Sequence, residues 1–172
     1  MSTLSIDEKA RLYASEKHKA VNHYYDQYPY VFHLQMVVSA AEKFIHLIPE
    51  KDRQNVLAGC WVHDVIEDAR ETYNDVKKAL NKDIAELAYA LTNNKGRTRQ
   101  ERAGKQYYVG IRNTPYAAFI KLCDRIANVT HSKNTGSRML KVYRKENPAF
   151  VEKLYDEKYV EVIQYLEKLV KE

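Results

Sequence analysis

The sequence predicts an all-α protein, a single helical bundle that fills residues 1–172. Apolar residues recur three or four positions apart along most of the chain, which is the spacing of a buried helix face. No segment shows the convincing alternation of apolar and polar residues that marks a half-buried strand. Gly (5 residues) and Pro (4 residues) are scarce, so we expect few turns and long helices.

Five helices are expected in the N-terminal half. Ser5 is a favoured N-cap residue, and the first helix runs from there to about residue 21. A polar, aromatic loop over 22–30 follows, and Pro29 separates it from a helix over 31–47. A turn over 49–52 leads to a helix over 53–69. Thr72 and Asp83 then cap shorter helices over 73–80 and 84–91.

The C-terminal half begins with a change in composition. Residues 93–105 hold five basic residues, two Gly and one acid, so we expect a loop over 93–106 and then a helix through about residue 111. Thr114-Pro115 is a favoured helix start, and the helix that follows carries Asp124 and Asn128. After a turn over 133–136, terminal helices over 137–145 and 149–171 are separated by Asn147-Pro148.

Composition narrows the class of protein. The two cysteines, Cys60 and Cys123, and the lack of a secretory segment predict buried thiols in a reducing cytoplasm. No apolar run approaches the ~20 residues that cross a bilayer. The net charge of +5 suits an anionic ligand or a nucleic acid. A nucleic acid is the less favoured partner, because the basic residues are not gathered along one helix with interleaved aromatics. The oligomeric state stays open.

One stretch, residues 60–68, concentrates groups that bind metals or move protons. His63, Asp64, Glu67 and Asp68 lie within six positions of an otherwise apolar segment. Ionised carboxylates in a core are costly unless they are paired or bound to a cation, and a divalent metal meets that cost. On one continuous helix, His63 and Glu67 would share a face.

Two other apolar helices carry further candidate ligands, His33 and Asp124. Neighbouring residues on a helix diverge by about 100°, so His63 and Asp64 need other elements to complete a metal shell. Two imidazoles and two carboxylates suit Mn, Fe, Co, Ni or Zn rather than Ca or Mg. The lack of a thiolate argues against a closed structural zinc site. The alternative is a set of hydrogen-bonded polar residues in the core.

These motifs resemble those of HD-domain metal phosphohydrolases. They are more similar to the alarmone hydrolase domain of RelA/SpoT proteins and to its small stand-alone forms of the metazoan SpoT homologue type. The matching segments are Ala14–His18, Pro29-Tyr30-x-x-His33, His63-Asp64-x-x-Glu67-Asp68, Leu91-Thr92-x-x-Lys95 and Lys121-Leu122-x-Asp124-x-x-x-Asn128. A His-Asp pair alone is a weak signal, but these motifs in this order are a specific one.

The resemblance implies an HD-domain fold and Mn²⁺-dependent removal of the 3′-pyrophosphate from (p)ppGpp, giving GDP or GTP and pyrophosphate. Under this hypothesis Glu67 and Asp68 handle the water and the proton, with acid and base roles undivided. The metal ligands are His33, His63, Asp64 and Asp124. The residues expected to contact the guanine nucleotide are Lys17, His18, Lys95, Arg97 and Asn128.

Two features leave alternatives open. The loop over 22–27 lacks the Arg and the Gly that alarmone hydrolases carry there, so the substrate could be NADPH, a deoxynucleotide or another nucleotide. Arg97, Arg99 and Arg102 suit phosphoryl oxygens but could equally form a solvated basic face. A nucleotide- or protein-binding module without turnover is the remaining alternative.

Overall fold

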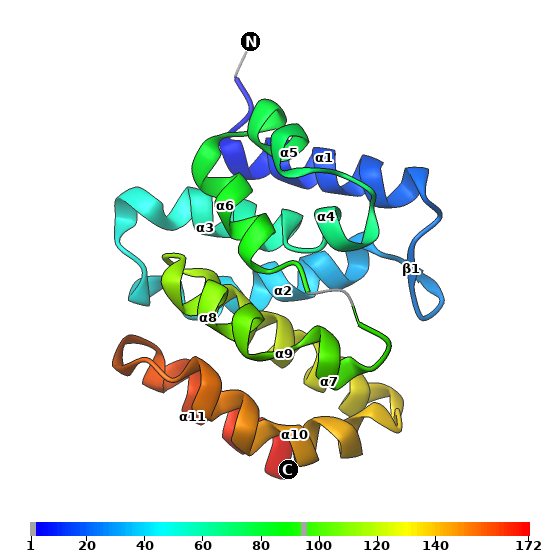
Figure 1. The fold of residues 1–172 in the computed structure, drawn as a ribbon, viewed down its shortest axis with the longest axis vertical. Helices are drawn as coiled ribbons and strands as arrows, with labels where there is room; N and C mark the ends of the chain where they lie inside the picture. The colour runs from blue at the N-terminus through cyan, green and yellow to red at the C-terminus, as the bar shows by residue number, and fades with distance from the viewer. Residues whose placement is uncertain (1–2, 94–95) are drawn as a thin grey trace.

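Helices stacked between the two chain ends form the fold (Figure 1). The computed structural model describes residues 3–93 and 96–172. α1 (Ile6–Ala20) packs against α3 (Glu50–Val62) at one end, and α10 (Met139–Leu154) packs against α11 (Val160–Lys171) at the other. α2 (Val31–Lys43) contacts both α3 and α9 (Ala117–Thr135), which places α2 and α9 in the middle. The predicted helical class is confirmed.

The core is centred on α9. This helix contacts α2, α3, α8 (Lys105–Asn113), α10 and α11. Its apolar residues are almost wholly buried, and Phe119, Ile120 and Leu122 have no exposed surface. Cys60 and Cys123 are buried and free, as predicted. An ionisable residue on α9 is therefore carried into the interior by the packing of its apolar neighbours.

Helix starts in the N-terminal half follow local capping. Ser5 caps α1, since its Oγ accepts from the Glu8 N–H at 3.2 Å and its own N–H donates to the Glu8 carboxylate at 2.8 Å. Thr72 caps α5 (Tyr73–Ala79) in the same way, as predicted. α6 (Lys82–Ala90) begins two residues earlier than expected, because Asn81 rather than Asp83 is its cap.

The turn expected over 49–52 is instead the start of α3. Pro49 stands at the N-cap position, and the Asp52 N–H donates to the Pro49 carbonyl at 2.9 Å. Pro has no N–H to satisfy at a helix start and its ring restricts the backbone, so it begins this helix rather than a loop. The segment after α2 tightens into a short 3₁₀ helix, η1 (Ile45–Leu47), inside the range predicted as one helix.

A small hairpin follows α1, where no strand was predicted. β1 (Tyr24–Tyr25) and β2 (Tyr28–Pro29) pair antiparallel, with Tyr25 opposite Tyr28. Asp26 takes a positive φ of 52° at the turn, a conformation that Asp tolerates. Two-residue strands are too short to show an alternating pattern, which is why the sequence did not reveal them.

The helix predicted over 53–69 is broken at its functional residues. α3 ends at Val62, and α4 (Val65–Asp68) starts after Asp64, whose φ of −109° and ψ of 0° leave the helical region. The Cys60 carbonyl, which a continuous helix would bond to the Asp64 N–H, lies 2.8 Å from His63 Nδ1 instead. The shared helix face that we expected for His63 and Glu67 is therefore wrong.

The C-terminal half departs from several expected boundaries. The turn expected over 133–136 is mostly helix, because α9 runs to Thr135 and ends at Gly136. Residues predicted as a loop contain the single turn of α7 (Arg99–Arg102), which Thr98 and Glu101 cap reciprocally, and the start of α8. α9 does not start at Thr114-Pro115. It starts after Tyr116, which takes a left-handed φ of 68°.

α10 runs through Pro148, although Asn147-Pro148 was expected to separate two helices. An interior Pro costs about 3 kcal/mol, but burial of Phe150 and Leu154 contributes about 2 kcal/mol each and offsets it. The chain turns later, at the short 3₁₀ helix η2 (Glu157–Tyr159). Within residues 3–93 and 96–172, no helix combines the length and apolar character that crossing a membrane requires.

Candidate metal centre

Four predicted metal ligands come from four separate elements and meet in the interior. His33 lies on α2, His63 ends α3, Asp64 precedes α4, and Asp124 lies in the middle of α9. One ligand atom from each of His33, His63 and Asp64 lies within 4.8 Å of the others. Asp124 Oδ1 lies 3.1 Å from His33 Nε2 and 3.7 Å from His63 Nε2. The structure thus brings the four side chains together.

The arrangement of donor atoms fits a cation. His63 is 1% exposed, and its Nδ1 donates to the Cys60 carbonyl, which leaves the lone pair on Nε2. That Nε2 is buried without a hydrogen-bond partner, yet it lies 2.9 Å from Asp64 Oδ2. Two lone pairs this close repel each other unless a proton or a metal ion lies between them. An imidazole fixed through its far nitrogen is also how proteins orient metal-ligating histidines.

The charges of the centre point the same way. Burial raises the pKa of Asp124, but Lys121 and the two imidazoles lower it by a larger amount. The pKa of Asp124 is therefore well below its usual range. Burial lowers the pKa of His63, but Asp64 and Asp124 raise it by more. The carboxylates therefore stay ionised, and the centre favours a positive charge at His63 Nε2.

A second layer of side chains fixes the carboxylates. The Tyr30 hydroxyl donates to Asp64 Oδ2. Asn128 Nδ2 donates to Asp124 Oδ1 at 2.9 Å, and Lys121 Nζ donates to Asp124 Oδ2 at 2.9 Å. Neither Tyr30 nor Lys121 was assigned to the metal centre from the sequence, although both stand inside the motifs that carry His33 and Asp124. Their three-residue spacing from those ligands is the signal that could have identified them.

The two predicted catalytic acids border the same cavity, of about 220 Å³. Glu67 accepts hydrogen bonds from the Asn93 backbone N–H and side-chain amide, each at 3.0 Å. Partial burial and the Asp64 carboxylate raise the pKa of Asp68 to about 7. Within the described residues neither acid forms an ion pair with Arg70 or Lys77. Both acids are thus available to a ligand in the cavity.

The residues predicted to contact substrate are spread more widely. Asn128 lines the cavity. Lys17 Nζ lies 3.6 Å from Glu71 Oε1, and Lys17 does not line the cavity. His18 is buried against Tyr30, and burial lowers its pKa to about 4. The structure therefore places neither Lys17 nor His18 at the mouth of the cavity.

Two more of these residues lie in the basic segment after α6. The Arg97 backbone N–H donates to Glu101 at 2.7 Å, and its side chain is exposed outside the lining. Lys95 lies outside the described residues.

The hairpin closes one side of the centre, which the sequence did not indicate. The Tyr25 ring stacks on His33 with centroids 4.7 Å apart, and its hydroxyl donates to Asn128 Oδ1 at 2.8 Å. Asp26 joins the hairpin to α9, because its Oδ2 lies 2.5 Å from His131 Nε2. Asn128 is therefore held between the hairpin and Asp124.

Comparison with a solved structure shows where this fold occurs elsewhere. The solved structure is that of a metazoan orthologue of SpoT that hydrolyzes ppGpp and plays a role in starvation responses. The TM-score is 0.74 at 21% identity, over 99% of this chain and 97% of that one. The fold is that of a metazoan SpoT orthologue. The predicted single-bundle helical class is thereby confirmed.

The sequence comparison agrees. The chain is 32% identical over 76 residues to the guanosine-3′,5′-bis(diphosphate) 3′-pyrophosphohydrolase MESH1 of Drosophila melanogaster. The match covers 44% of this chain and 42% of MESH1, less than half of that protein. No family model matches the chain. The resemblance to metazoan SpoT homologues, drawn above from short motifs, is confirmed by both comparisons.

Proposed function

We propose that this chain is a metal-dependent phosphohydrolase that removes the 3′-pyrophosphate from (p)ppGpp. The observation that carries the proposal is the convergence of two imidazoles and two carboxylates on one buried point, with the unpartnered His63 Nε2 facing it. The likeness to MESH1 supports the choice of substrate. Buried free thiols at Cys60 and Cys123 suit a reducing cytoplasm as its location.

His33, His63, Asp64 and Asp124 would hold the metal, for which Mn²⁺ is the proposed identity. A bound divalent ion would supply a Lewis acid and lower the pKa of a coordinated water. Tyr30 and Lys121 keep the two carboxylates in fixed orientations through their hydrogen bonds. The shell is therefore largely assembled before an ion binds, which favours tight and specific binding.

Glu67 and Asp68 are the proposed catalytic pair. Both border the cavity in front of the ligands, where a carboxylate can orient an attacking water or give a proton to the leaving oxygen. Asn93 fixes the Glu67 carboxylate with two hydrogen bonds, so one member of the pair has a set direction. Asn128, which lines the same cavity, is positioned to contact the nucleotide.

The test is pyrophosphate release from ppGpp by the purified chain. Protein supplied with Mn²⁺ should release pyrophosphate and guanosine diphosphate, and removal of divalent ions with a chelating resin should stop the reaction. Readdition of Mn²⁺ should restore it. Absence of release with every divalent ion tested, from protein whose circular dichroism is helical, would contradict the proposal.

The hairpin favours a second candidate, a phosphohydrolase of the same type that acts on another nucleotide. The Tyr25 hydroxyl already donates to the side-chain oxygen of Asn128, Oδ1. Residues 22–27 contain no Arg or Gly to receive a guanine base and its phosphates. NADPH and the deoxynucleoside triphosphates are the substrates to compare with ppGpp in one competition panel. A higher kcat/KM for one of them would favour this candidate.

A further inference from the structure

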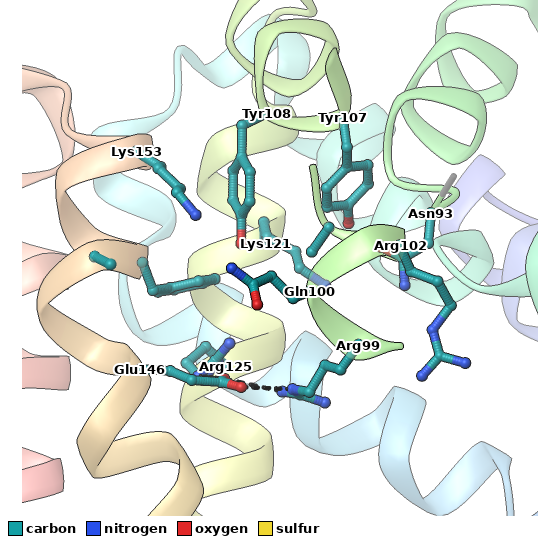
Figure 2. Close-up of a pocket in the computed structure, with 13 residues that line it drawn as sticks. Asn93, Arg99, Gln100, Arg102, Tyr107, Tyr108, Lys121, Arg125, Glu146 and Lys153 are labelled. Carbon is teal, nitrogen blue, oxygen red and sulfur yellow. Dashed lines mark hydrogen bonds and ion pairs between the residues drawn. The ribbon is translucent and has the colours of Figure 1, made fainter. Parts of the chain in front are cut away.

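A second cavity, of about 330 Å³, opens beside the metal centre and is walled by α7, α8, α9 and α10 (Figure 2). Its wall shares Asn93, Arg99, Lys121 and Arg125 with the cavity of the metal centre. Lys121 joins the two directly, since its Nζ also contacts Asp124. Cavities that take small ligands start at about 300 Å³. The two cavities are therefore adjacent, and a ligand that reaches past Lys121 would contact both.

The second cavity is strongly positive, and we call it the basic pocket. Its charged lining residues are Arg99, Arg102, Lys121, Arg125, Lys153 and Glu146. Lys121 is already paired with Asp124, so the other four cations face a single carboxylate. A concave wall with charges of one sign concentrates its potential and attracts anions. An electrically neutral ligand, or a cationic one, would be disfavoured in this space.

Two of the three arginines in the basic pocket, Arg99 and Arg125, share one carboxylate. Glu146 accepts from Arg99 Nε at 2.7 Å and Nη2 at 3.1 Å, and from Arg125 Nη1 at 3.0 Å (Figure 2). The Arg125 guanidinium lies over the rings of Phe150, at 4.1 Å, and Tyr143, at 4.8 Å. One carboxylate cannot neutralise two guanidiniums. The two arginines therefore keep an excess positive charge, with further N–H donors to offer to a ligand.

Other donors in the basic pocket have no partner within the described chain. Lys153 Nζ lies 4.8 Å from the centre of the Tyr108 ring and takes part in no ion pair among residues 3–93 and 96–172. Figure 2 shows the Lys153 ammonium, the Tyr108 hydroxyl and the Gln100 amide turned toward the same space. Several donors around one small volume match an anion with several oxygens, and phosphate is the best fit.

We infer that the basic pocket binds a second phosphate group of the substrate, next to the phosphate attacked at the metal centre. The inference rests on the proposed function for its substrate class. It identifies that class as nucleotides with at least two phosphates within reach of each other, and predicts discrimination against a nucleotide with one. The second phosphate has two possible sources, the outer phosphate of a 3′-diphosphate or the phosphates at the 5′ position.

Anion binding can be tested without metal or turnover. Protein freed of divalent ions would be titrated with inorganic pyrophosphate by calorimetry, comparing wild type with Lys153→Met. Methionine keeps an apolar stem on Tyr108 and removes the charge. Lys158→Met, an exposed lysine on η2, is the matched control. We expect about tenfold weaker binding in Lys153→Met only, the size of one charged contact. Equal affinity in all three proteins would overturn the inference.

Kinetics identify which phosphate occupies the pocket. The Mn²⁺-loaded proteins would hydrolyse ppGpp, guanosine 3′-diphosphate, and guanosine 5′-diphosphate 3′-monophosphate. Lys153→Met should raise KM for ppGpp about tenfold with kcat unchanged. A matching rise for guanosine 3′-diphosphate alone identifies the outer 3′ phosphate, and a rise for the third substrate alone identifies the 5′ phosphates. An unchanged KM for ppGpp would overturn the inference.

The two proposals fail separately in these experiments. If no nucleotide is hydrolysed, the proposed function is contradicted, but the pyrophosphate titration still reports on the basic pocket because it needs no reaction. If hydrolysis is normal and pyrophosphate does not bind the metal-free wild type at millimolar concentration, the inference falls and the proposed function stands.

Discussion

The metal centre and the basic pocket share Lys121, yet they are built differently. At the metal centre His33, His63 and Asp124 are buried and Asp64 is half-buried. Tyr30 restrains Asp64, and the Cys60 carbonyl restrains His63. In the basic pocket Arg99, Arg102 and Lys153 are exposed. One of them, Lys153, has no ion-pair partner within the described chain. One site is fixed before a ligand arrives, and the other offers charge.

This difference separates two tasks of a phosphohydrolase. Chemistry at a metal needs atoms held within a few tenths of an ångström, which only a packed interior provides. Binding of a phosphate group needs charge and several donors but tolerates some movement. Substitutions in the two regions should therefore affect different steps, chemistry in the first and phosphate binding in the second.

The largest effect is expected from Asp64→Asn. A neutral amide is a poor metal ligand, so the variant should lose the several kcal/mol that a Lewis acid supplies, about a thousandfold or more in kcat/KM. Its affinity for pyrophosphate in metal-free form should be unchanged, because the basic pocket is untouched. Asp83→Asn, an exposed carboxylate on α6, is the control. Wild-type turnover in Asp64→Asn would contradict the assignment of this ligand.

Glu67→Gln should remove turnover, while the metal centre still binds Mn²⁺ and the basic pocket still binds pyrophosphate. We expect kcat to fall about a hundredfold or more, as for loss of a positioned acid or base, with Mn²⁺ affinity retained. Gln can accept only one of the two Asn93 hydrogen bonds, because its amide nitrogen is a donor, so a crystal structure should accompany the kinetics. Glu152→Gln, an exposed acid on α10, is the matched control. Undiminished kcat would place the catalytic acid elsewhere.

Tyr30→Phe tests whether restraint distinguishes the metal centre. The substitution removes the hydroxyl that donates to Asp64 but keeps the ring that stacks on His23, with centroids 3.8 Å apart. Mn²⁺ affinity should fall about tenfold to a hundredfold, the usual cost of losing such a partner. Tyr28→Phe changes an exposed hydroxyl and should have no effect. Equal Mn²⁺ affinity in both variants would show that the restraint is unimportant.

The smallest effect is expected for His18, whose ring packs against the Tyr30 ring. The His18 imidazole takes up a proton near pH 6.5 in the unfolded chain but only near pH 4 in the folded protein. Acidification therefore favours unfolding. Wild type should lose on the order of 1 to 2 kcal/mol more stability than His18→Gln between pH 7 and pH 5. Urea unfolding at both pH values measures this. An equal loss in the two proteins would mean that His18 is protonated in the fold.

Most helices could be predicted from the sequence because their signals are local. Ser5 and Thr72 cap helices through residues only three positions away, and apolar spacing defines the buried faces. The break at Asp64 could not be predicted, since it depends on where the His63 imidazole finds an acceptor. Helix α10 continues through Pro148 because of distant packing partners.

The site divides along the same line. His33 and Asp124 were predicted because a polar residue in an apolar helix is conspicuous, and the structure brings both to the same point. Tyr25 was not assigned to the centre, because its place depends on a hairpin that has no sequence pattern. Lys153 lies on α10 and enters the basic pocket only through the packing of α10 on α9.

A Mn²⁺ titration of protein stripped of divalent ions tests the central claim most directly. Electron paramagnetic resonance of the free ion would count the bound Mn²⁺ in wild type and in the double variant His33→Ala/His63→Ala, with circular dichroism to confirm folding. The account predicts one ion per chain in wild type and none held at comparable affinity in the variant. Equal binding by the two folded proteins, or no binding by wild type, would contradict it.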